Sequence, residues 1–275
     1  MTANNDQSQP FDDAPISPDD LLAIVRILAD VSGMTEPLPV RKRALMDALC
    51  PLLGAERWVW TTSSGFEEGK TPTGIAVSYG GFSEREFGLM IEASQDTEAG
   101  MPENAPMIHD VLTHGHVTRT RSDWIADEAF YKHPQWTLYR QHAGTDQYLF
   151  SLFPLGDGFV SGIGVHRPPG EPDFSPRERR IIHLIASEIG WLHTADIPEQ
   201  SAGSSIDELS PRLRTVMTFL LQGWNRKQIA SHLGIAPDTA AGYIKQVYRR
   251  FGVGSQPQLI SKFVRGDGGD SVSGS

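Results

Sequence analysis

Cysteine is almost absent from this chain of 275 residues, because Cys50 is the only one. A single cysteine excludes an internal disulfide framework and any zinc site built from several cysteines. No apolar run reaches the roughly 18–20 residues that a membrane span needs. The polar, acidic start of the chain has neither the basic region nor the apolar run of a signal peptide. We therefore expect a cytoplasmic protein that does not contact the membrane.

The short signatures of several enzyme classes are also missing. The chain has no G-x-S-x-G, no P-loop, no H-E-x-x-H and no dinucleotide-binding fingerprint. His114 and His116 would share one face of a strand near Asp110, but a metal site would need a third ligand that the sequence does not place. We therefore expect no catalytic residues, no bound metal and no cofactor.

Basic residues are outnumbered overall, yet they are concentrated near one end. The chain has 24 Lys and Arg against 34 Asp and Glu, a net charge of −10. Residues 209–265 hold nine Lys or Arg and one acid, Asp238, which gives +8. Residues 1–208 hold 15 basic and 31 acidic residues, which gives −16. This segregation predicts a small basic part that meets a polyanion and a larger part that does not.

The larger part reads as one folded domain over residues 17–195. Ser17-Pro18-Asp19-Asp20 and Ser175-Pro176-Arg177-Glu178 have the capping-box pattern of helix starts. Strands are predicted near residues 57–62, 74–78, 147–154 and 158–166, the last two joined by a tight turn. An α+β domain follows, preceded by a disordered tail over residues 1–16 and followed by a polar linker over residues 196–207.

The basic part predicts an all-α domain over residues 208–266, with a flexible tail over residues 267–275. A short helix around Ile229 and Leu233 is followed by Gly234 and then by a longer helix that begins at Pro237. This order of short helix, glycine turn and longer helix is typical of the helix-turn-helix motif.

The longer helix carries two different faces. Its apolar residues recur at helical spacing, and the opposite face combines small residues with long hydrogen-bond donors, as a helix lying in the major groove requires. Residues that open the preceding helix suit phosphate contacts. The candidate DNA-binding residues are Arg226, Lys227, Asp238, Thr239, Ala241, Gly242, Lys245, Gln246, Arg249 and Arg250.

These residues lie in a segment that closely resembles the C-terminal DNA-binding domain of the LuxR (GerE) family of bacterial regulators. The features that carry the resemblance are Leu209-Ser210-Pro211-Arg212, Gly223, Lys227-Gln228-Ile229-Ala230, Leu233-Gly234-Ile235, Thr239, Val247, Tyr248, Phe251-Gly252-Val253 and Ser255. The resemblance implies a four-helix domain that binds double-stranded DNA as a homodimer, with the fourth helix in the dimer contact. It also implies RNA polymerase as a partner.

The segment departs from the family pattern at several positions. Ala236 stands where a serine usually caps the third helix, and Ala241 and Tyr243 stand where Lys and His are usual. Arg is more usual where Gln256 stands. These departures leave the fold in place, but the operator sequence cannot be carried over from relatives. They also keep open the alternative of a protein–protein adaptor whose DNA-binding domain has degenerated.

The N-terminal domain resembles the GAF-like and PAS-like sensory domains that precede such DNA-binding ends. The resemblance rests on residues 21–53, Gly54-Ala55-Glu56-Arg57-Trp58, residues 130–144, residues 162–167 and Phe174-Ser175-Pro176-Arg177-Glu178-Arg179. It implies a cup-shaped sheet that holds a small molecule of unknown identity. The Trp, Tyr, Asp and Trp set of acyl-homoserine-lactone sensors cannot be aligned here, and the aspartates of a phosphorelay receiver are absent.

Aromatic side chains of this domain are candidates for a ligand pocket, with ordinary core packing as the alternative. They are Trp58, Trp60, Trp124, Tyr131, Trp136 and Tyr139. A homodimer is expected through Leu259, Ile260 and Phe263 of the fourth helix, with capping of the domain's own core as the alternative. The most economical function is a signal-modulated transcriptional regulator, and an enzyme with an accessory DNA-binding end is the competing hypothesis.

Overall fold

The computed structural model describes residue 11, residues 13–194 and residues 209–264. The chain divides into two compact units, residues 1–195 and residues 196–275. The tails predicted over residues 1–16 and 267–275 and the linker predicted over residues 196–207 lie wholly or largely outside the described residues. Within the described part, no helix has both the length and the apolar character needed to cross a bilayer.

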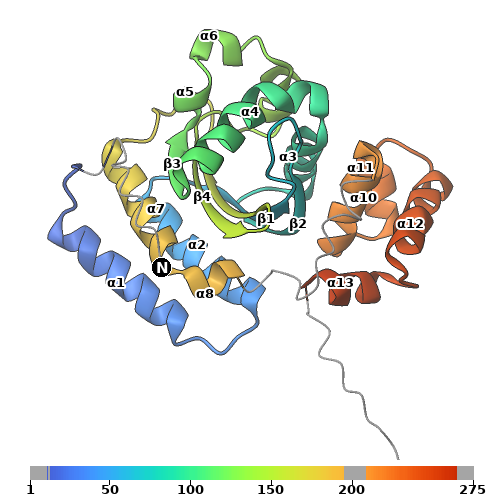
Figure 1. The fold of residues 1–275 in the computed structure, drawn as a ribbon, viewed down its shortest axis with the longest axis horizontal. Helices are drawn as coiled ribbons and strands as arrows, with labels where there is room; N and C mark the ends of the chain where they lie inside the picture. Colours follow the sequence, from blue (N-terminus) through green and yellow to red (C-terminus); the bar gives the residue numbers. More distant parts are fainter. Residues whose placement is uncertain (1–10, 12, 195–208, 265–275) are drawn as a thin grey trace, which may run out of the picture. The chain divides into compact units, whose positions relative to one another are not determined.

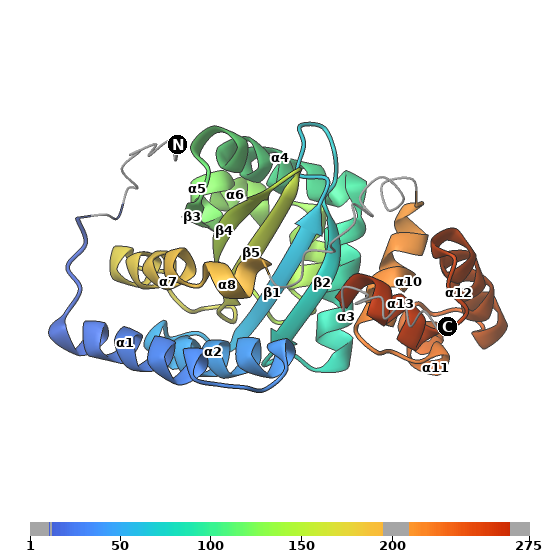
Figure 2. The ribbon, with the colours of Figure 1, turned by 60° about the horizontal axis from the view of Figure 1, so that its bottom comes forward.

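A five-stranded antiparallel sheet forms the centre of the N-terminal unit (Figure 1), and its strand order is β2-β1-β5-β4-β3 (Figure 2). The strands are β1 (Arg57–Ser64), β2 (Thr73–Gly80), β3 (Val117–Thr120), β4 (Tyr148–Gly156) and β5 (Phe159–His166). Four of them were predicted from the sequence. The edge strand β3 was not, because four residues are too few to show an alternating pattern.

The predicted hairpin between β4 and β5 is confirmed. Asp157 and Gly158 both have positive φ angles, 50° and 74°, and Gly156 pairs with Phe159 across the turn. A two-residue turn with two left-handed residues matches the natural twist of the strands that it joins, and Asp-Gly is one of the sequences that form it most readily.

Helices cover both faces of the sheet (Figures 1 and 2). On one face, referred to as the first face, lie α1 (Pro18–Ser32), α2 (Leu38–Leu52), α7 (Pro176–Glu188) and α8 (Gly190–His193). On the second face lie α3 (Glu84–Gln95), α4 (Thr97–His114), α5 (Arg121–Trp124), α6 (Asp127–Phe130) and the π-helix η1 (Gln135–Arg140). The mixed helix and sheet architecture agrees with the predicted α+β class.

The main core lies between the first face and its helices. Ile181, Ile182 and Ile185 of α7 are completely buried there, and so are Ile189 and Leu192 beyond it. Burial of each such side chain stabilises the fold by about 1.5–3 kcal/mol. The apolar residues of this closing helix are therefore packed inside the domain and are not available for contact with a second copy of the chain.

Helix α7 ends before its apolar pattern does, since the buried residues Ile189 and Leu192 lie beyond it. Helix α7 ends at Glu188, Ile189 leaves the helical region with φ −103° and ψ 31°, and α8 starts at Gly190. Glycine is a poor helix former by about 1 kcal/mol relative to alanine, so the break falls beside the residue that most weakens the helix.

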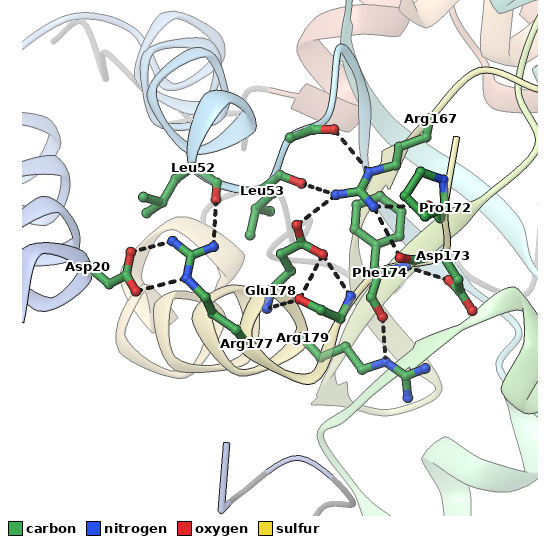
Figure 3. Close-up of polar contacts among 12 residues, drawn as sticks. Asp20, Leu52, Leu53, Arg167, Pro172, Asp173, Phe174, Arg177, Glu178 and Arg179 are labelled. Carbon is green, nitrogen blue, oxygen red and sulfur yellow. Dashed lines mark hydrogen bonds and ion pairs between the residues drawn. The ribbon is translucent and has the colours of Figure 1, made fainter. Parts of the chain in front are cut away.

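A buried arginine fixes the start of α7 (Figure 3). The guanidinium of Arg167 donates hydrogen bonds to the carbonyl oxygens of Leu53 (2.7 Å), Gly54 (3.0 Å), Pro172 (3.0 Å) and Asp173 (3.2 Å). It also pairs with the Glu178 carboxylate at 2.7 Å and lies over the ring of Phe174. Glu178 in turn accepts from the backbone N–H of Ser175, which completes the predicted capping box.

A second ion pair joins α7 to α1, and Figure 3 shows it beside the first. Arg177 donates two hydrogen bonds to the carboxylate of Asp20, which is itself the capping-box partner of Ser17. These hydrogen bonds lower the pKa of Asp20 to about 2. The two capping boxes predicted from the sequence therefore both form and are linked to each other.

The C-terminal unit has four described helices, as the sequence predicts. They are α10 (Pro211–Leu221), α11 (Arg226–His232), α12 (Pro237–Phe251) and α13 (Gln256–Val264). Between α11 and α12 the chain passes through Gly234 at φ 61°, a left-handed conformation that glycine adopts without strain. This is the turn of the predicted helix-turn-helix.

We expect residues 207–265 to fold as an isolated segment, because the unit has an apolar core of its own. Val216, Met217, Phe219, Val247 and Leu259 are all at most 1% exposed within it. The measurement is thermal unfolding followed by far-ultraviolet circular dichroism, where a cooperative helical transition is expected. A gradual, non-cooperative loss of signal would contradict the prediction.

Candidate nucleic-acid interface

Helix α12 is held by a buried face. Ala240, Val247 and Phe251 are at most 4% exposed and pack against the helices before it. Gly252 ends the helix at φ 65° and ψ 31°, and its N–H donates to the carbonyl oxygens of Tyr248 and Arg249. The predicted apolar stripe therefore forms, although Ile244 in its middle is only half-buried.

Polar contacts lock the helices around α12. The side chain of Gln256 donates to the carbonyl oxygens of Leu220 (2.8 Å) and Trp224 (3.0 Å), so it satisfies groups that the end of α10 leaves open. Arg212 donates to the carbonyl oxygen of Leu233 at the end of α11. Gln256, which departs from the family pattern, is therefore a structural link between α13 and α10.

An aromatic cluster supports the loop between α10 and α11. The rings of Phe219 and Trp224 stack with centroids 4.3 Å apart, and His232 of α11 meets both edge-on. Asn225 then caps α11 by accepting from the N–H groups of Lys227 and Gln228. This cap fixes where α11 begins and hence where Arg226 and Lys227 project.

The predicted DNA-binding residues lie on the outer side of this frame. Eight of them are exposed: Arg226, Lys227, Asp238, Thr239, Lys245, Gln246, Arg249 and Arg250. Ala241 and Gly242 are half-buried, and a Cβ atom added at Gly242 would meet nothing within 4 Å. The outer face of α12 is thus shallow in its middle and lined by long side chains.

Two cations on this face are available for a ligand. Lys245 and Arg249 are four residues apart, so they lie one above the other on the helix surface. Within the described part of the chain, neither side chain has an ion-pair partner. A phosphate or a base edge would therefore meet charges that no carboxylate of the described residues already neutralises.

Helix α12 starts without a side-chain cap. Ala236 occupies the N-cap position with extended backbone angles, φ −62° and ψ 144°, and makes no capping hydrogen bond. We expect Ala236→Ser to stabilise the domain by about 0.5–1 kcal/mol, because a serine hydroxyl there can accept from the free N–H groups of the first turn. Chemical unfolding of residues 207–265 measures this. Ala236→Val, which supplies no capping group, is the control, and equal stability of Ala236→Ser and the parent would contradict the expectation.

The candidate dimer residues of α13 differ in how far their side chains are buried. Leu259 is completely buried in the core of its own domain, so it does not face outward, and this part of the predicted surface is corrected. Ile260 is half-buried. The side chain of Phe263 lies outside the described residues.

In the N-terminal unit, the structure separates the six candidate pocket residues into two sets. Trp58 and Trp60 share one side of β1, as predicted, but that side is the first face, where both are at most 2% exposed. The Trp60 indole N–H donates to Ser161, and that of Trp58 donates to Asp47. These two residues belong to the main core, which corrects their assignment to a ligand pocket.

The other four residues lie among the helices and loops of the second face. Trp124 and Trp136 border a cluster formed by Phe130, Tyr148 and Ile125. The Tyr131 hydroxyl donates to the carboxylate of Asp146 at 3.0 Å, and the Tyr139 hydroxyl donates to Asp96 at 2.6 Å. Burial and the acceptor carboxylates raise the pKa of both tyrosines, so both hydroxyls stay protonated.

The second face also carries residues that were not singled out from the sequence. Phe150 of β4 is half-buried and covers Gly164, where a Cβ atom would come within 2.2 Å of its ring. His166 of β5 is completely buried, and neither ring nitrogen has a hydrogen-bond partner among the described residues. Burial, with Arg140 and Arg57 nearby, lowers the pKa of His166, so it is neutral. The alternation of β4 and β5 was the signal that could have assigned them to this face.

Neither a metal centre nor a reactive thiol is found in the described residues. His114 pairs with Asp110, whereas His116 turns away toward Ser151, so the two histidines do not converge. No group of three potential ligands occurs within the described ranges. Burial raises the pKa of the Cys50 thiol to about 12, so it is not a thiolate at neutral pH.

Comparison with known proteins identifies the C-terminal unit. Residues 207–263 match the family described as bacterial regulatory proteins, luxR family. This segment is a LuxR-family helix-turn-helix domain. A comparison with curated proteins finds no match for the chain.

Alignments with solved structures of low sequence identity cover more of the chain than this family match does. SdiA from Escherichia coli is 14% identical with a TM-score of 0.45, covering 90% of this chain and 97% of that one. SdiA in complex with octanoyl-rac-glycerol is 12% identical with a TM-score of 0.41, covering 92% and 97%. The LBD domain of VqsR from Pseudomonas aeruginosa is 13% identical with a TM-score of 0.43, covering 64% and 94%.

Proposed function

We propose that this chain is a transcriptional regulator that binds operator DNA as a dimer through α12, under the control of a signal at its N-terminal domain. The observation that carries the proposal is the outer face of α12 within a LuxR-family domain. It combines exposed Lys245, Gln246 and Arg249 with the half-buried small residues Ala241 and Gly242.

The chemistry of this face suits a helix in the major groove. Arginine reads guanine through two parallel hydrogen bonds, glutamine reads adenine, and lysine contacts phosphate or guanine. Small residues let the helix backbone come close to the base edges. Arg226 and Lys227 at the start of α11 suit phosphate contacts, which position the domain but do not specify sequence.

Dimerisation is part of the proposal, because one such domain contacts only a few base pairs. Two copies related by a twofold axis would read half-sites about one helical turn apart. With Leu259 buried in the domain's own core, Ile260 is the candidate dimer residue whose described side chain remains partly exposed for the contact. Recruitment of RNA polymerase would follow from DNA binding and belongs to the same proposal.

The test is the salt dependence of binding of the full chain to a pool of random duplexes, measured by fluorescence anisotropy. A dimer that makes 6–10 phosphate contacts should lose about 10³–10⁵ in affinity between 50 and 200 mM salt. Absence of salt-dependent binding would overturn the proposal and favour the adaptor, since Ala236, Ala241 and Tyr243 replace residues that are usual in the family.

We assign the signal to the second face of the sheet and propose that the N-terminal domain is a GAF-like or PAS-like sensor. Val59 and Thr61 lie on a central strand beneath helices, yet they are only half-buried, and Trp124 and Trp136 border the same side. Native mass spectrometry of the purified full chain tests this. A bound small molecule that Trp136→Ala removes and Trp58→Phe retains supports the site. Retention in both variants would contradict it.

A further inference from the structure

Three histidines gather between the first face of the sheet and the helices α7 and α8. His116 precedes β3, His183 lies on α7, and His193 ends α8. The rings of His116 and His183 stack with centroids 4.0 Å apart and planes 12° apart. Phe153 of β4 stacks on His193 and also contacts His116. We name this group the histidine cluster.

The hydrogen bonds of His193 are all satisfied by its neutral form. Its Nε2 lies 2.9 Å from the carbonyl oxygen of Ala186, which only accepts, so Nε2 carries the proton. Its Nδ1 lies 2.7 Å from the Ser161 hydroxyl, and the Trp60 indole N–H donates to that same oxygen. With Nε2 protonated in the neutral imidazole, Nδ1 is the acceptor, and the Ser161 hydroxyl, whose oxygen already accepts from Trp60, donates to it. A second proton on His193 would break this arrangement.

The other two histidines follow the same logic. The Ser187 hydroxyl donates to the carbonyl oxygen of His183, so its oxygen accepts from His116 Nδ1. In the neutral ring His116 Nε2 is then the acceptor for the Ser151 hydroxyl at 2.8 Å. Thr118 donates to Ser151 and accepts from His183 Nδ1 at 2.9 Å. In this arrangement every hydroxyl donates once, and one N–H on each of the three imidazoles is enough to satisfy all of these contacts.

The charges that act on the cluster all oppose protonation. The protonated forms of His183 and His193 would repel a proton on His116, and Lys42 of α2, which lies over the Trp60 ring, repels a proton on His193. The groups contributed by β3, β4 and β5 are the uncharged Thr118, Ser151 and Ser161. Burial and these charges lower the pKa of His116 to about 3 and that of His193 to about 4.

We propose that the histidine cluster is an acid-sensitive clasp, which holds α8 on the sheet while its imidazoles are neutral and releases α8 when they become protonated. Helix α8 is the last element of the N-terminal unit, and the chain runs on from it through residues 195–208 to the C-terminal unit. Release would therefore act on the segment that joins the two units.

The sign of the pH effect follows from linkage. An opened state has histidines with ordinary pKa values near 6.5, so between pH 6.5 and about 4 it binds more protons than the closed state. The clasp is fully stable above pH 6.5 and weakens as the pH falls. Each histidine raises the opening constant by up to about tenfold per pH unit, or about a hundredfold for His116 and His193 together.

The test is amide hydrogen exchange of the full chain, read by mass spectrometry on peptides spanning residues 186–194 between pH 7.5 and 5 and corrected for intrinsic exchange. We expect the opening constant of this segment to rise at least tenfold between pH 6.5 and 5. His193→Gln should reduce the rise of the opening constant by about tenfold per pH unit. His109 is exposed, so His109→Gln should leave the rise unchanged. Constant protection of α8, or the same rise in His193→Gln, would overturn the clasp.

A second measurement does not depend on a variant that folds. Nuclear magnetic resonance titration of the imidazole signals of the full chain should show two histidines that remain neutral at pH 5.5. If all nine histidines instead titrate near pH 6.5 while the fold persists, the closed and opened states have the same histidine pKa values. Protonation then cannot favour opening, and the proposal fails.

Discussion

Replacing Arg167 by alanine is expected to destabilise the N-terminal domain by about 3–5 kcal/mol, because removal of one partner leaves the other charge of a buried pair uncompensated. The Arg167 side chain is 7% exposed and that of Glu178 is 15% exposed. The substitution also removes the hydrogen-bond donor of four carbonyl oxygens near the start of α7. Figure 3 shows these oxygens around the guanidinium. Urea unfolding of the full chain, followed by tryptophan fluorescence, measures the loss.

Two variants separate this role from charge alone. Arg167→Lys keeps the charge but lacks the planar fork of donors, so it should recover little of the lost stability. Lys132→Ala removes an exposed ion pair with Glu128 and should change stability by less than about 1 kcal/mol. If Arg167→Lys is as stable as the parent, the hydrogen-bond network around Arg167 is not what holds α7.

Reversing two charges on α12 should abolish specific DNA binding. In the double variant Lys245→Glu, Arg249→Glu, two exposed cations become anions one helical turn apart, facing a phosphate backbone. Loss of a base contact alone costs about 1–3 kcal/mol, and the reversed charges add repulsion, so we expect the affinity to fall by more than about a hundredfold. Fluorescence anisotropy on a selected duplex measures it.

Single substitutions assign the two contacts. If Lys245 contacts phosphate, Lys245→Ala should weaken binding to all sequences and reduce the salt slope by about one ion. If Arg249 reads a guanine, Arg249→Ala should relax one base position. The matched control is Arg26→Glu, an exposed cation on α1 whose reversal should leave affinity unchanged. Equal affinity of the double variant and the parent would remove α12 from the interface.

The elements that the sequence predicted are those with strong local signals. Serine followed three residues later by an acid marked the starts of α1 and α7, and Asp157-Gly158 marked the hairpin of β4 and β5. In each case the residues that determine the structure lie within four positions of one another. The outer face of α12 could be predicted for the same reason, since helical periodicity alone separates Lys245 and Arg249 from Val247 and Phe251.

Features that depend on distant packing could not be predicted. The pattern of β1 showed that Trp58 and Trp60 share a face, but only the sheet order shows that this face meets α2 and α7. Likewise, the apolar character of Leu259 did not reveal whether it turns toward its own core or a partner. The histidine cluster joins residues up to 77 positions apart through Trp60, Ser161 and their neighbours, a connection that no local pattern contains.

The central claim, that this chain regulates transcription by reading operator DNA through α12, is tested most directly by mapping where it binds across the genome of its host. The account predicts discrete sites upstream of genes that share a twofold-symmetric sequence with half-sites about one helical turn apart. It also predicts that the double variant Lys245→Glu, Arg249→Glu loses those sites at equal protein abundance. Uniform occupancy without a common sequence, or the same sites in the double variant, would contradict it.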